Sequence, residues 1–502
     1  MTTNGTTNGV NGHSTSHHTS LHTNETTSDH VVPLLINGEE ITTETTFDVT
    51  SPDTNKVIWR ASTVSKQDAI RAVEAAQAAF PAWSKTTPSY RRDILLKASD
   101  ILARRTDEAA EYMEVETGSA KSYSSGLNVP AAVEQLRDVA GRIAASTGYT
   151  AVSSQEGRSA LVVKEPYGVV FGIAPWNAPY ILGFRAISYA LAAGNTCVLK
   201  GPEMSPRCYW LIGTVLKEAG LPDGCLNVLF HQPSDAAEIT RTIIEHPFVK
   251  KINYTGSSHI GSIVAGIAGK ALKPILMELG GKAPAIVLKD ANLEKAAHAC
   301  AIGAFVHSGQ ICMSTERILV HTSIASNFST ALKKAVDEIF GANSPAPILV
   351  NAPPVKKNKK LVEQALSKGA KIISGDVNAT EQSETRMRPI VVEGVTKEMD
   401  MYYTESFGPT VSIIAVDSED EAVQIANDTE YGLSSAVFTE DLATGLRVAR
   451  QIETGAVHIN NMSVHDEPSL PHGGAKASGF GRFNASAGLE EFQRMKTLTW
   501  AD

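Results

Sequence analysis

Residues 168–200 read GVVFGIAPWNAPYILGFRAISYALAAGNTCVLK. The stretch begins with an apolar run rich in β-branched residues, continues with a helical pattern over 179–193, and ends with a second apolar run, TCVLK. Short apolar runs bounded by Gly and Pro are typical of buried strands. The stretch therefore predicts a strand, a helix and a second strand in succession.

The same alternation continues along the chain. Further apolar runs are LNVLF, INYTG and AIVL, and the helical patterns between them cover residues 206–219, 236–245 and 259–269. Strands and helices that alternate at this spacing imply right-handed crossovers and a parallel sheet. We expect an α/β fold of the dinucleotide-binding type, with ligands at the carboxyl ends of the strands.

Other elements flank this region. VVPLLINGEE predicts two short strands around the Asn37-Gly38 turn, and helical patterns follow at 66–83 and 90–117. A second α/β region runs from 279 to 471, with helical patterns at 293–305 and 324–340 and strands at 317–320, 411–416 and 456–459. Residues 149–164 and 495–500 alternate as strands and predict a small separate sheet.

Composition limits the classes of partner. The 502-residue chain has a formal net charge of -9, which argues against nucleic acid, and no apolar run reaches the roughly 18 residues of a membrane span. Five cysteines without a CxxC pair fit neither a disulfide framework nor a zinc site, so we expect no metal and a reducing compartment. We expect a soluble, cytoplasmic protein.

The first thirty residues differ from the rest. Residues 1–30 are rich in Thr, Asn, Ser, Gly and His, contain no Lys or Arg, and lack the apolar stretch of a secretory signal. They predict a disordered tail, and we assign no function to its histidines.

Cys312 is a candidate nucleophile in SGQICMSTER. It directly follows a helical run, where backbone N–H groups near helix termini lower a thiol pKa and favour the reactive thiolate. Taken alone, a Cys between Ile311 and Met313 is more often a small core residue.

Two further polar residues lie beside apolar runs. Glu278 ends one such run before Gly280 and Gly281, where partial desolvation would raise its pKa toward that of a general base. The alternative is a surface or hinge carboxylate. Asn177 falls in a strand-to-helix loop and could donate to an oxyanion or, alternatively, cap the helix.

A cofactor site is also indicated. Lys200 ends the strand TCVLK, and Glu203 follows where an acidic side chain accepts hydrogen bonds from an adenosine ribose. Gly256 and Ser257 lie in a turn from strand to helix, which suits a pyrophosphate.

Taken together, the motifs resemble those of the aldehyde dehydrogenase superfamily over nearly the whole chain from Val31 to Trp500. PWN, VLKGPE, TGS, ELGGK, GQICMSTER, ESFGP and PHGGAKASGFGR occur in the family's order, and Cys312 follows Glu278 by 34 residues, as in its active-site pair. NAPYILGFRA, GQICMSTER and SVHDEP look most like the salicylaldehyde, benzaldehyde and vanillin dehydrogenase branch.

The resemblance implies a covalent oxidation. Cys312 adds to the aldehyde, while the Asn177 side chain and the Cys312 backbone N–H hold the oxyanion. Hydride then leaves for the nicotinamide, and Glu278 activates the water that hydrolyses the resulting thioester. The product is a carboxylic acid.

For the cofactor, the resemblance assigns Lys200 and Glu203 to the adenosine ribose and Ser257, beside Gly256, to the pyrophosphate. Glu405 is assigned to the nicotinamide ribose and Phe407 to its ring, and Trp176 lines the same cleft. The Glu203 carboxylate would repel a 2′-phosphate, so we expect NAD rather than NADP.

For the substrate, the resemblance implies a pocket formed by Tyr180, Phe184, Arg185, Ile311, Met313 and His472. Aromatic and thioether groups suit an aromatic or bulky conjugated aldehyde, and Arg185 could bind its polar substituent or instead form a salt bridge within the subunit. The sequence departs from the family twice. His472 stands where Phe is usual, which would alter the pocket, and Phe483 stands where many members have Glu, which would alter proton exit.

The expected architecture has three parts: a Rossmann-type NAD-binding domain (31–147 and 168–278), a catalytic thiol domain (279–479), and a bridging β-sheet segment (148–167 and 480–502). In the family such a sheet builds a homodimer or homotetramer. One alternative function is an acylating dehydrogenase that passes the thioester to coenzyme A, which the presence of Glu278 disfavours. A non-catalytic structural protein is the other, and Cys312, Asn177 and Glu278 argue against it.

Overall fold

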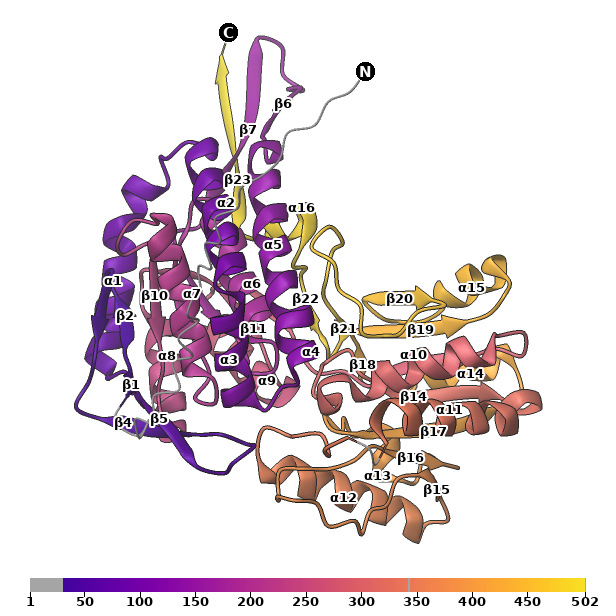
Figure 1. The fold of residues 1–502 in the computed structure, drawn as a ribbon. Helices are drawn as coiled ribbons and strands as arrows, with labels where there is room; N and C mark the ends of the chain where they lie inside the picture. The colour runs from indigo at the N-terminus through magenta and orange to yellow at the C-terminus, as the bar shows by residue number, and fades with distance from the viewer. Residues whose placement is uncertain (1–29, 342–343, 502) are drawn as a thin grey trace, which may run out of the picture.

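The computed structural model describes residues 30–341 and 344–501, and two large sheets dominate its fold (Figure 1). Apart from residue 30, the predicted disordered tail lies outside the described residues. Within the described ranges, every helix is too short or too polar to cross a membrane.

The larger sheet has the strand order β22-β12-β11-β8-β9-β10-β2-β3. The five central strands, from β12 to β10 in this order, run parallel, as the alternation of strands and helices predicts. The edge strands β22, β2 and β3 pair antiparallel with their neighbours. The strands are β2 (Leu34–Ile36), β3 (Glu39–Ile41), β8 (Val169–Ile173), β9 (Thr196–Lys200), β10 (Leu226–Leu229), β11 (Val249–Thr255), β12 (Ile275–Glu278) and β22 (Gly479–Phe480).

Helices pack on this sheet in two rows, and neighbouring helices within each row are in contact. One row contains α1 (Lys66–Trp83), α8 (Ala236–Glu245) and α9 (Ser258–Lys270). The other contains α6 (Pro179–Ala192) and α7 (Pro206–Ala219), backed by α2 (Pro88–Arg104), α3 (Thr106–Thr117) and α5 (Val129–Arg142). Buried aliphatic and aromatic side chains fill the space between helices and sheet.

The prediction of one helix over 90–117 is wrong, because α2 and α3 are separate helices. Arg105 lies between them with φ −96° and ψ 19°, outside helical geometry. Its guanidinium bonds to Glu108 at 2.7 Å and to Thr214 of α7 at 3.1 Å, so the break directs this side chain onto a neighbouring helix. Helix α5 and the strands β4 (Thr46–Thr50) and β5 (Val57–Ser62) have no counterpart among the predicted elements, and the two strands form a small sheet, β1-β5-β4, with β1 (Val31–Val32) of the predicted VVPLLINGEE segment.

The second large sheet has the strand order β15-β16-β17-β14-β13-β19-β20 and is parallel except at β15. Its strands are β13 (Ala283–Val287), β14 (Thr315–His321), β15 (Lys371–Ser374), β16 (Ile390–Glu393), β17 (Thr410–Val416), β19 (Ser434–Phe438) and β20 (Ala456–Ile459). Its main helices are α10 (Leu293–Phe305), α11 (Ala325–Phe340), α12 (Ala352–Ser367), α14 (Glu419–Asn427) and α15 (Leu442–Ala449). The strands and helices predicted in this region all lie within one or two residues of these bounds.

A third, small sheet consists of β6 (Tyr149–Ala151), β7 (Arg158–Pro166) and β23 (Gln493–Ala501), all antiparallel. In Figure 1 the yellow β23 runs beside the purple β7, and this sheet projects away from the rest of the molecule. The prediction of a small separate sheet from these two segments is confirmed.

The carboxyl ends of the parallel strands in the larger sheet position the site. Ile173 of β8 pairs with Lys200 of β9, and Thr255 of β11 pairs with Glu278 of β12. The residues that follow these four strand ends therefore gather at one edge of the sheet, where ligands bind in open α/β folds.

Candidate active site

The Cys312 thiol and the Glu278 carboxylate are in direct contact. Cys312 Sγ donates to Glu278 Oε1 at 3.0 Å. Glu278 is the last residue of β12 and is fully buried, so the alternative of a surface or hinge carboxylate is wrong. A thiol and a buried carboxylate at this distance can exchange a proton.

A tight turn presents Cys312. His307, Ser308 and Gly309 all have left-handed backbone conformations, with φ of 51°, 60° and 71°. The Gln310 side chain fixes the turn, because Nε2 donates to the His307 carbonyl at 3.1 Å and Oε1 accepts from Val350 N at 2.9 Å. Such strained backbone persists only where its surroundings hold it.

Glycine at position 281 allows the two halves of the site to approach. A Cβ atom there would lie 2.2 Å from the backbone oxygen of Cys312. A larger residue would therefore separate the loop after Glu278 from the loop that carries Cys312.

The pKa shifts of Cys312 and Glu278 are both opposite to those expected from the sequence. Burial raises the pKa of the Cys312 thiol well above its usual range, and the negative charge of Glu278 raises it further. Burial also favours a higher pKa for Glu278, but the proximity and charge of His472, together with Arg185, outweigh it and lower that pKa. The resting site therefore holds a protonated thiol beside a carboxylate that can accept the proton.

Asn177 lies beside the same thiol. Its Nδ2 donates to the Gln310 carbonyl at 2.9 Å, and an amide nitrogen carries a second proton for another acceptor. Helix α6 begins at Pro179 with Ala178 as its cap residue, so the alternative role of Asn177 as a helix cap is wrong.

Two cavities meet at this point. The Arg185 cavity, of about 210 Å³, and the Phe407 cavity, of about 330 Å³, share the four lining residues Asn177, Leu182, Glu278 and Cys312. A molecule in either cavity would thus reach the thiol.

The Arg185 cavity has largely aliphatic and thioether walls. Of the predicted pocket residues, it is lined by Arg185, Ile311, Met313 and His472. The predicted residues Tyr180 and Phe184 are instead fully buried in the core, and Tyr180 Oη donates to the Ala109 carbonyl at 2.7 Å. Apolar residues that sequence reasoning missed are Tyr123, Leu127, Ile181, Leu182, Met462 and Val464.

Helical geometry explains why Tyr180 and Phe184 do not line the Arg185 cavity. Ala178, Ile181, Leu182 and Arg185 line the cavity at the three- and four-residue spacing of one helix face. The same periodicity, counted from Arg185, is the signal that could have identified Ile181 and Leu182 instead of Tyr180 and Phe184.

Arg185 is engaged within the chain. It is buried, and its Nη2 donates to Asp466 Oδ2 in a short ion pair, which is the alternative that the sequence left open. Asp466 also accepts from Asn484 Nδ2 at 2.8 Å. Sequence reasoning assigned no role to Asp466, although it lies in the quoted motif SVHDEP.

The Phe407 cavity contains most of the residues expected at a cofactor. Its lining includes Trp176, Gly256, Ser257, Glu405 and Phe407. Ser257 is the cap residue of α9, whose N-terminus therefore lies at the cavity and favours phosphate groups. Trp176 and Phe407 meet edge to face, with ring centroids 6.0 Å apart.

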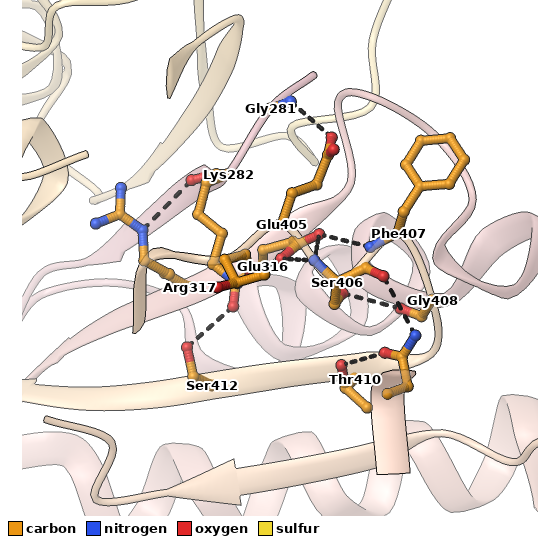
Figure 2. Close-up of polar contacts among 12 residues, drawn as sticks. Gly281, Lys282, Glu316, Arg317, Glu405, Ser406, Phe407, Gly408, Thr410 and Ser412 are labelled. Carbon is orange, nitrogen blue, oxygen red and sulfur yellow. Dashed lines mark hydrogen bonds and ion pairs between the residues drawn. The ribbon is translucent and has the colours of Figure 1, made fainter. Parts of the chain in front are cut away.

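Figure 2 shows how the loop of Glu405 and Phe407 is held. Both carboxylate oxygens of Glu316 accept from Ser406 N at 2.8 Å, and Oε1 also accepts from Phe407 N at 3.1 Å. Glu316 is in turn paired with Lys282 at 2.5 Å, in a buried position. Sequence reasoning missed this pair, although both residues lie in the quoted motifs ELGGK and GQICMSTER.

Glu405 points back toward the β12 loop. One of its oxygens accepts from Gly281 N at 2.7 Å. Burial, followed by the charge of Glu316, raises the pKa of Glu405 to about 7. Gly280 provides the room, since a Cβ there would lie 2.8 Å from a Glu405 oxygen.

Lys200 is the last residue of β9, and Glu203 follows three residues later. Neither is among the residues that line the Phe407 cavity. Burial lowers the pKa of Lys200, and the negative charge of Glu203 opposes this shift. The two side chains are therefore close enough to interact at the carboxyl edge of the larger sheet.

Comparisons with known proteins agree with this geometry. The chain matches the aldehyde dehydrogenase family over residues 40–498. It is 42% identical over 476 residues to vanillin dehydrogenase from Pseudomonas sp. (strain HR199 / DSM 7063), covering 93% of this chain and 97% of that protein. Benzaldehyde dehydrogenase (NAD+) from Pseudomonas putida is 34% identical over 465 residues, with coverages of 90% and 93%. The crystal structure of salicylaldehyde dehydrogenase from Pseudomonas putida G7 complexed with salicylaldehyde gives a TM-score of 0.90 at 36% identity, covering 94% of this chain and 98% of that one.

Proposed function

The chain belongs to the aldehyde dehydrogenase family, and from this membership we propose that it oxidises an aromatic aldehyde to the carboxylic acid, using NAD and a thioester on Cys312. One observation carries the proposal: the two cavities meet at a thiol that touches a buried carboxylate and lies beside the Asn177 amide. One cavity would hold the aldehyde, and the other the cofactor.

Cys312 is the nucleophile in this proposal. Its thiol passes a proton to Glu278 as sulfur attacks the aldehyde carbon, and the second Asn177 N–H and the Cys312 backbone N–H bind the resulting oxyanion. After oxidation to the thioester, and once Glu278 has released the thiol proton, Glu278 takes a proton from water as the new C–O bond forms. The C–S bond breaks, and Glu278 returns this proton to the thiolate. The carboxylic acid leaves, and Cys312 returns to its starting state.

The residues of the Phe407 cavity fit NAD, which accepts the hydride when bound. The α9 N-terminus with Gly256 and Ser257 would hold the pyrophosphate, while Glu405 and Phe407 would hold the nicotinamide ribose and ring. Trp176 would line the cleft. Lys200 and Glu203 would bind the adenosine ribose, and the Glu203 carboxylate would repel the 2′-phosphate of NADP.

Two observations favour an aromatic substrate. The Arg185 cavity combines aliphatic and thioether walls, contributed by residues such as Ile311 and Met313, with the single aromatic ring of Tyr123. The relatives described above are named for vanillin, benzaldehyde and salicylaldehyde. Arg185 and His472 supply polar groups to the same cavity, where a ring hydroxyl could find a partner.

The two alternatives fit less well. An acylating dehydrogenase does not need a carboxylate that activates water, whereas Glu278 lies against the thiol. A non-catalytic protein would have no use for the convergence of Cys312, Asn177 and Glu278 on two open cavities.

The proposal also assigns an organisation. Residues 31–147 and 168–278 form the NAD-binding domain, 279–479 the catalytic domain, and 148–167 with 480–502 the bridging segment, although β22 adds residues 479–480 to the larger sheet. The third sheet has the exposed apolar residues Tyr149, Met495, Leu498 and Trp500, and the exposed Val152 directly follows β6, which supports a role of this sheet in a homodimer or homotetramer. We assign the protein to the cytoplasm. Light scattering on the purified protein would measure that assembly.

Initial rates of NADH formation test the proposed reaction. Benzaldehyde-type substrates should give a higher kcat/KM than long-chain or small aliphatic aldehydes, and Cys312→Ser should abolish turnover while NAD still binds. A preference for small aliphatic aldehydes would contradict the aromatic substrate alone. Substantial turnover by Cys312→Ser would remove the thioester from the mechanism.

A further inference from the structure

A chain of buried titratable side chains leads away from the catalytic pair. His472 Nε2 lies 3.7 Å from Glu278 Oε1, and His472 Nδ1 lies 3.7 Å from Asp466 Oδ1. Asp466 is then paired with Arg185 through its other oxygen. The imidazole of His472 therefore lies between two carboxylates, one of which touches the Cys312 thiol.

The backbone fixes the position of His472. It pairs with Phe483 in both directions, with His472 N donating to the Phe483 carbonyl at 2.9 Å and Phe483 N donating back at 2.7 Å. The two residues that depart from the family's sequence pattern are thus hydrogen-bonded to each other. Asn484, next in the chain, donates to Asp466, so one segment holds both His472 and Asp466.

In the proposed reaction Glu278 needs a neighbouring group to which it can pass the proton that it takes from Cys312. Once Glu278 has taken the thiol proton it is a neutral acid, and it must lose that proton before it can activate water. Its side chain is fully buried and reaches solvent through the two cavities that it lines, which the aldehyde and the cofactor would fill. Its Oε2 atom has no hydrogen-bond partner among the described residues, whereas Oε1 faces both the thiol and His472.

We propose that His472 is a positioning residue that accepts this proton from Glu278 and thereby restores the base within each turnover. The inference rests on the proposed role of Glu278. The proton moves from Cys312 Sγ to Glu278 Oε1 and then to His472 Nε2, and the imidazolium later releases it through the Arg185 cavity, which His472 lines. During hydrolysis Glu278 takes the proton of water and returns it to Cys312 Sγ as the C–S bond breaks.

The charges around His472 suit this role. Transfer from the protonated Glu278 to a neutral His472 leaves the net charge of the cluster unchanged, and it forms an imidazolium that lies between the Glu278 carboxylate and Asp466. Transfer requires the 3.7 Å separation to shorten to about 3 Å, as catalytic contacts do when a substrate binds. The titratable groups that face or neighbour His472 are Glu278 on β12, Arg185 on α6, Cys312, His458 on β20, and His465 and Asp466 on the loop after β20.

Chemical rescue provides the test. His472→Ala should keep the first burst of NADH but lower the steady rate by roughly 10², the lower range for a lost proton-transfer group. Added imidazole should restore the steady rate by roughly tenfold or more, because it occupies the vacated space and accepts the proton. His465→Ala, which removes the other histidine lining the Arg185 cavity, and Glu278→Gln should gain nothing from imidazole.

Two further variants separate proton transfer from packing. His472→Phe fills the space without a basic nitrogen, and it should move the acid limb of the steady-rate pH profile to higher pH, because His472 lowers the Glu278 pKa. His472→Gln keeps polarity but cannot carry the proton, and it should remain slow.

The outcomes are distinct. A fast His472→Gln enzyme, or a slow His472→Ala enzyme that imidazole does not rescue, would show a packing role and overturn the inference. A full steady rate in His472→Ala beside a slow Glu278→Gln would overturn the inference and leave the proposed function intact. A full steady rate in Glu278→Gln would instead remove the proposed base.

Discussion

Arg185 and Asp466 form an ion pair although they lie 281 residues apart in the sequence. Arg185 comes from α6, against the larger sheet, whereas Asp466 comes from the loop that follows β20 of the second sheet. The guanidinium is buried, which lowers its pKa, but the charges of Asp466 and Glu278 together outweigh burial and raise that pKa. The pair therefore joins the two halves of the molecule beside the catalytic thiol.

Arg185→Met should destabilise the protein, because it leaves the Asp466 carboxylate largely buried without its cation. The expected loss is about 3 kcal/mol in the free energy of unfolding, as for other broken buried pairs. Arg185→Met combined with Asp466→Asn should recover most of it. Urea unfolding measures the three proteins, and equal stability of wild type and Arg185→Met would contradict the prediction.

Glu278→Gln should make Cys312 easier to ionise. The negative charge of Glu278 raises the pKa of the thiol, in addition to the larger effect of burial, so loss of that charge lowers the pKa. The pH midpoint of inactivation by iodoacetamide should shift to lower pH in the variant. A midpoint that stays in place or rises would show that the two side chains are not coupled as the 3.0 Å contact implies.

Asn177→Ala should lower kcat by about 10² to 10³, the usual effect of losing one oxyanion donor. The variant should leave KM for NAD nearly unchanged, since the contact is made to the reacting oxygen. Steady-state rates with a benzaldehyde-type substrate measure both constants. An effect confined to KM for the aldehyde would assign Asn177 to substrate binding instead.

Glu316→Gln should weaken NAD binding although Glu316 lies outside the described lining of both cavities. The carboxylate holds Ser406 N and Phe407 N, so its loss should loosen the loop that presents Glu405 and Phe407. We expect KM for NAD to rise about tenfold, equivalent to about 1.4 kcal/mol. The control Glu363→Gln, on the exposed side of α12, should leave KM for NAD unchanged, and equal effects would refute the loop's dependence on Glu316.

Glu203→Ala should narrow the preference for NAD over NADP. Removal of the carboxylate removes its repulsion of a 2′-phosphate, so kcat/KM for NADP should rise relative to that for NAD. Parallel assays with both cofactors measure the ratio. A fixed ratio would mean that another group selects the cofactor.

Local patterns predicted most of the fold but less of the site. The apolar runs of β8, β9, β10 and β11 and the helices between them follow from short-range periodicity, which the sequence contains directly. On helix α6, however, successive side chains point about 100° apart, so Tyr180 was predicted in place of its neighbour Ile181, and Phe184 was added beside the correctly predicted Arg185. Motifs identified Cys312 and Glu278, which the structure brings into contact.

Long-range partners left no local signal. Asp466 meets Arg185 and His472 only after the two large sheets have packed, and nothing around Asp466 in the sequence indicates either contact. The predicted pKa directions of Cys312 and Glu278 were wrong because they depend on tertiary structure: burial raises the pKa of the thiol, and His472 and Arg185 lower that of the carboxylate against the effect of burial.

Strand β22 has a consequence for biosynthesis. Gly479 pairs with Glu278, so the last strand at this edge of the larger sheet leaves the ribosome long after the strand that it completes. His472 and Asp466 emerge equally late. A nascent chain that already contains Cys312, Asn177 and Glu278 would therefore still present an open sheet edge at its reactive thiol, and contacts so distant in sequence form slowly. During translation, this edge is where we expect a chaperone to be needed.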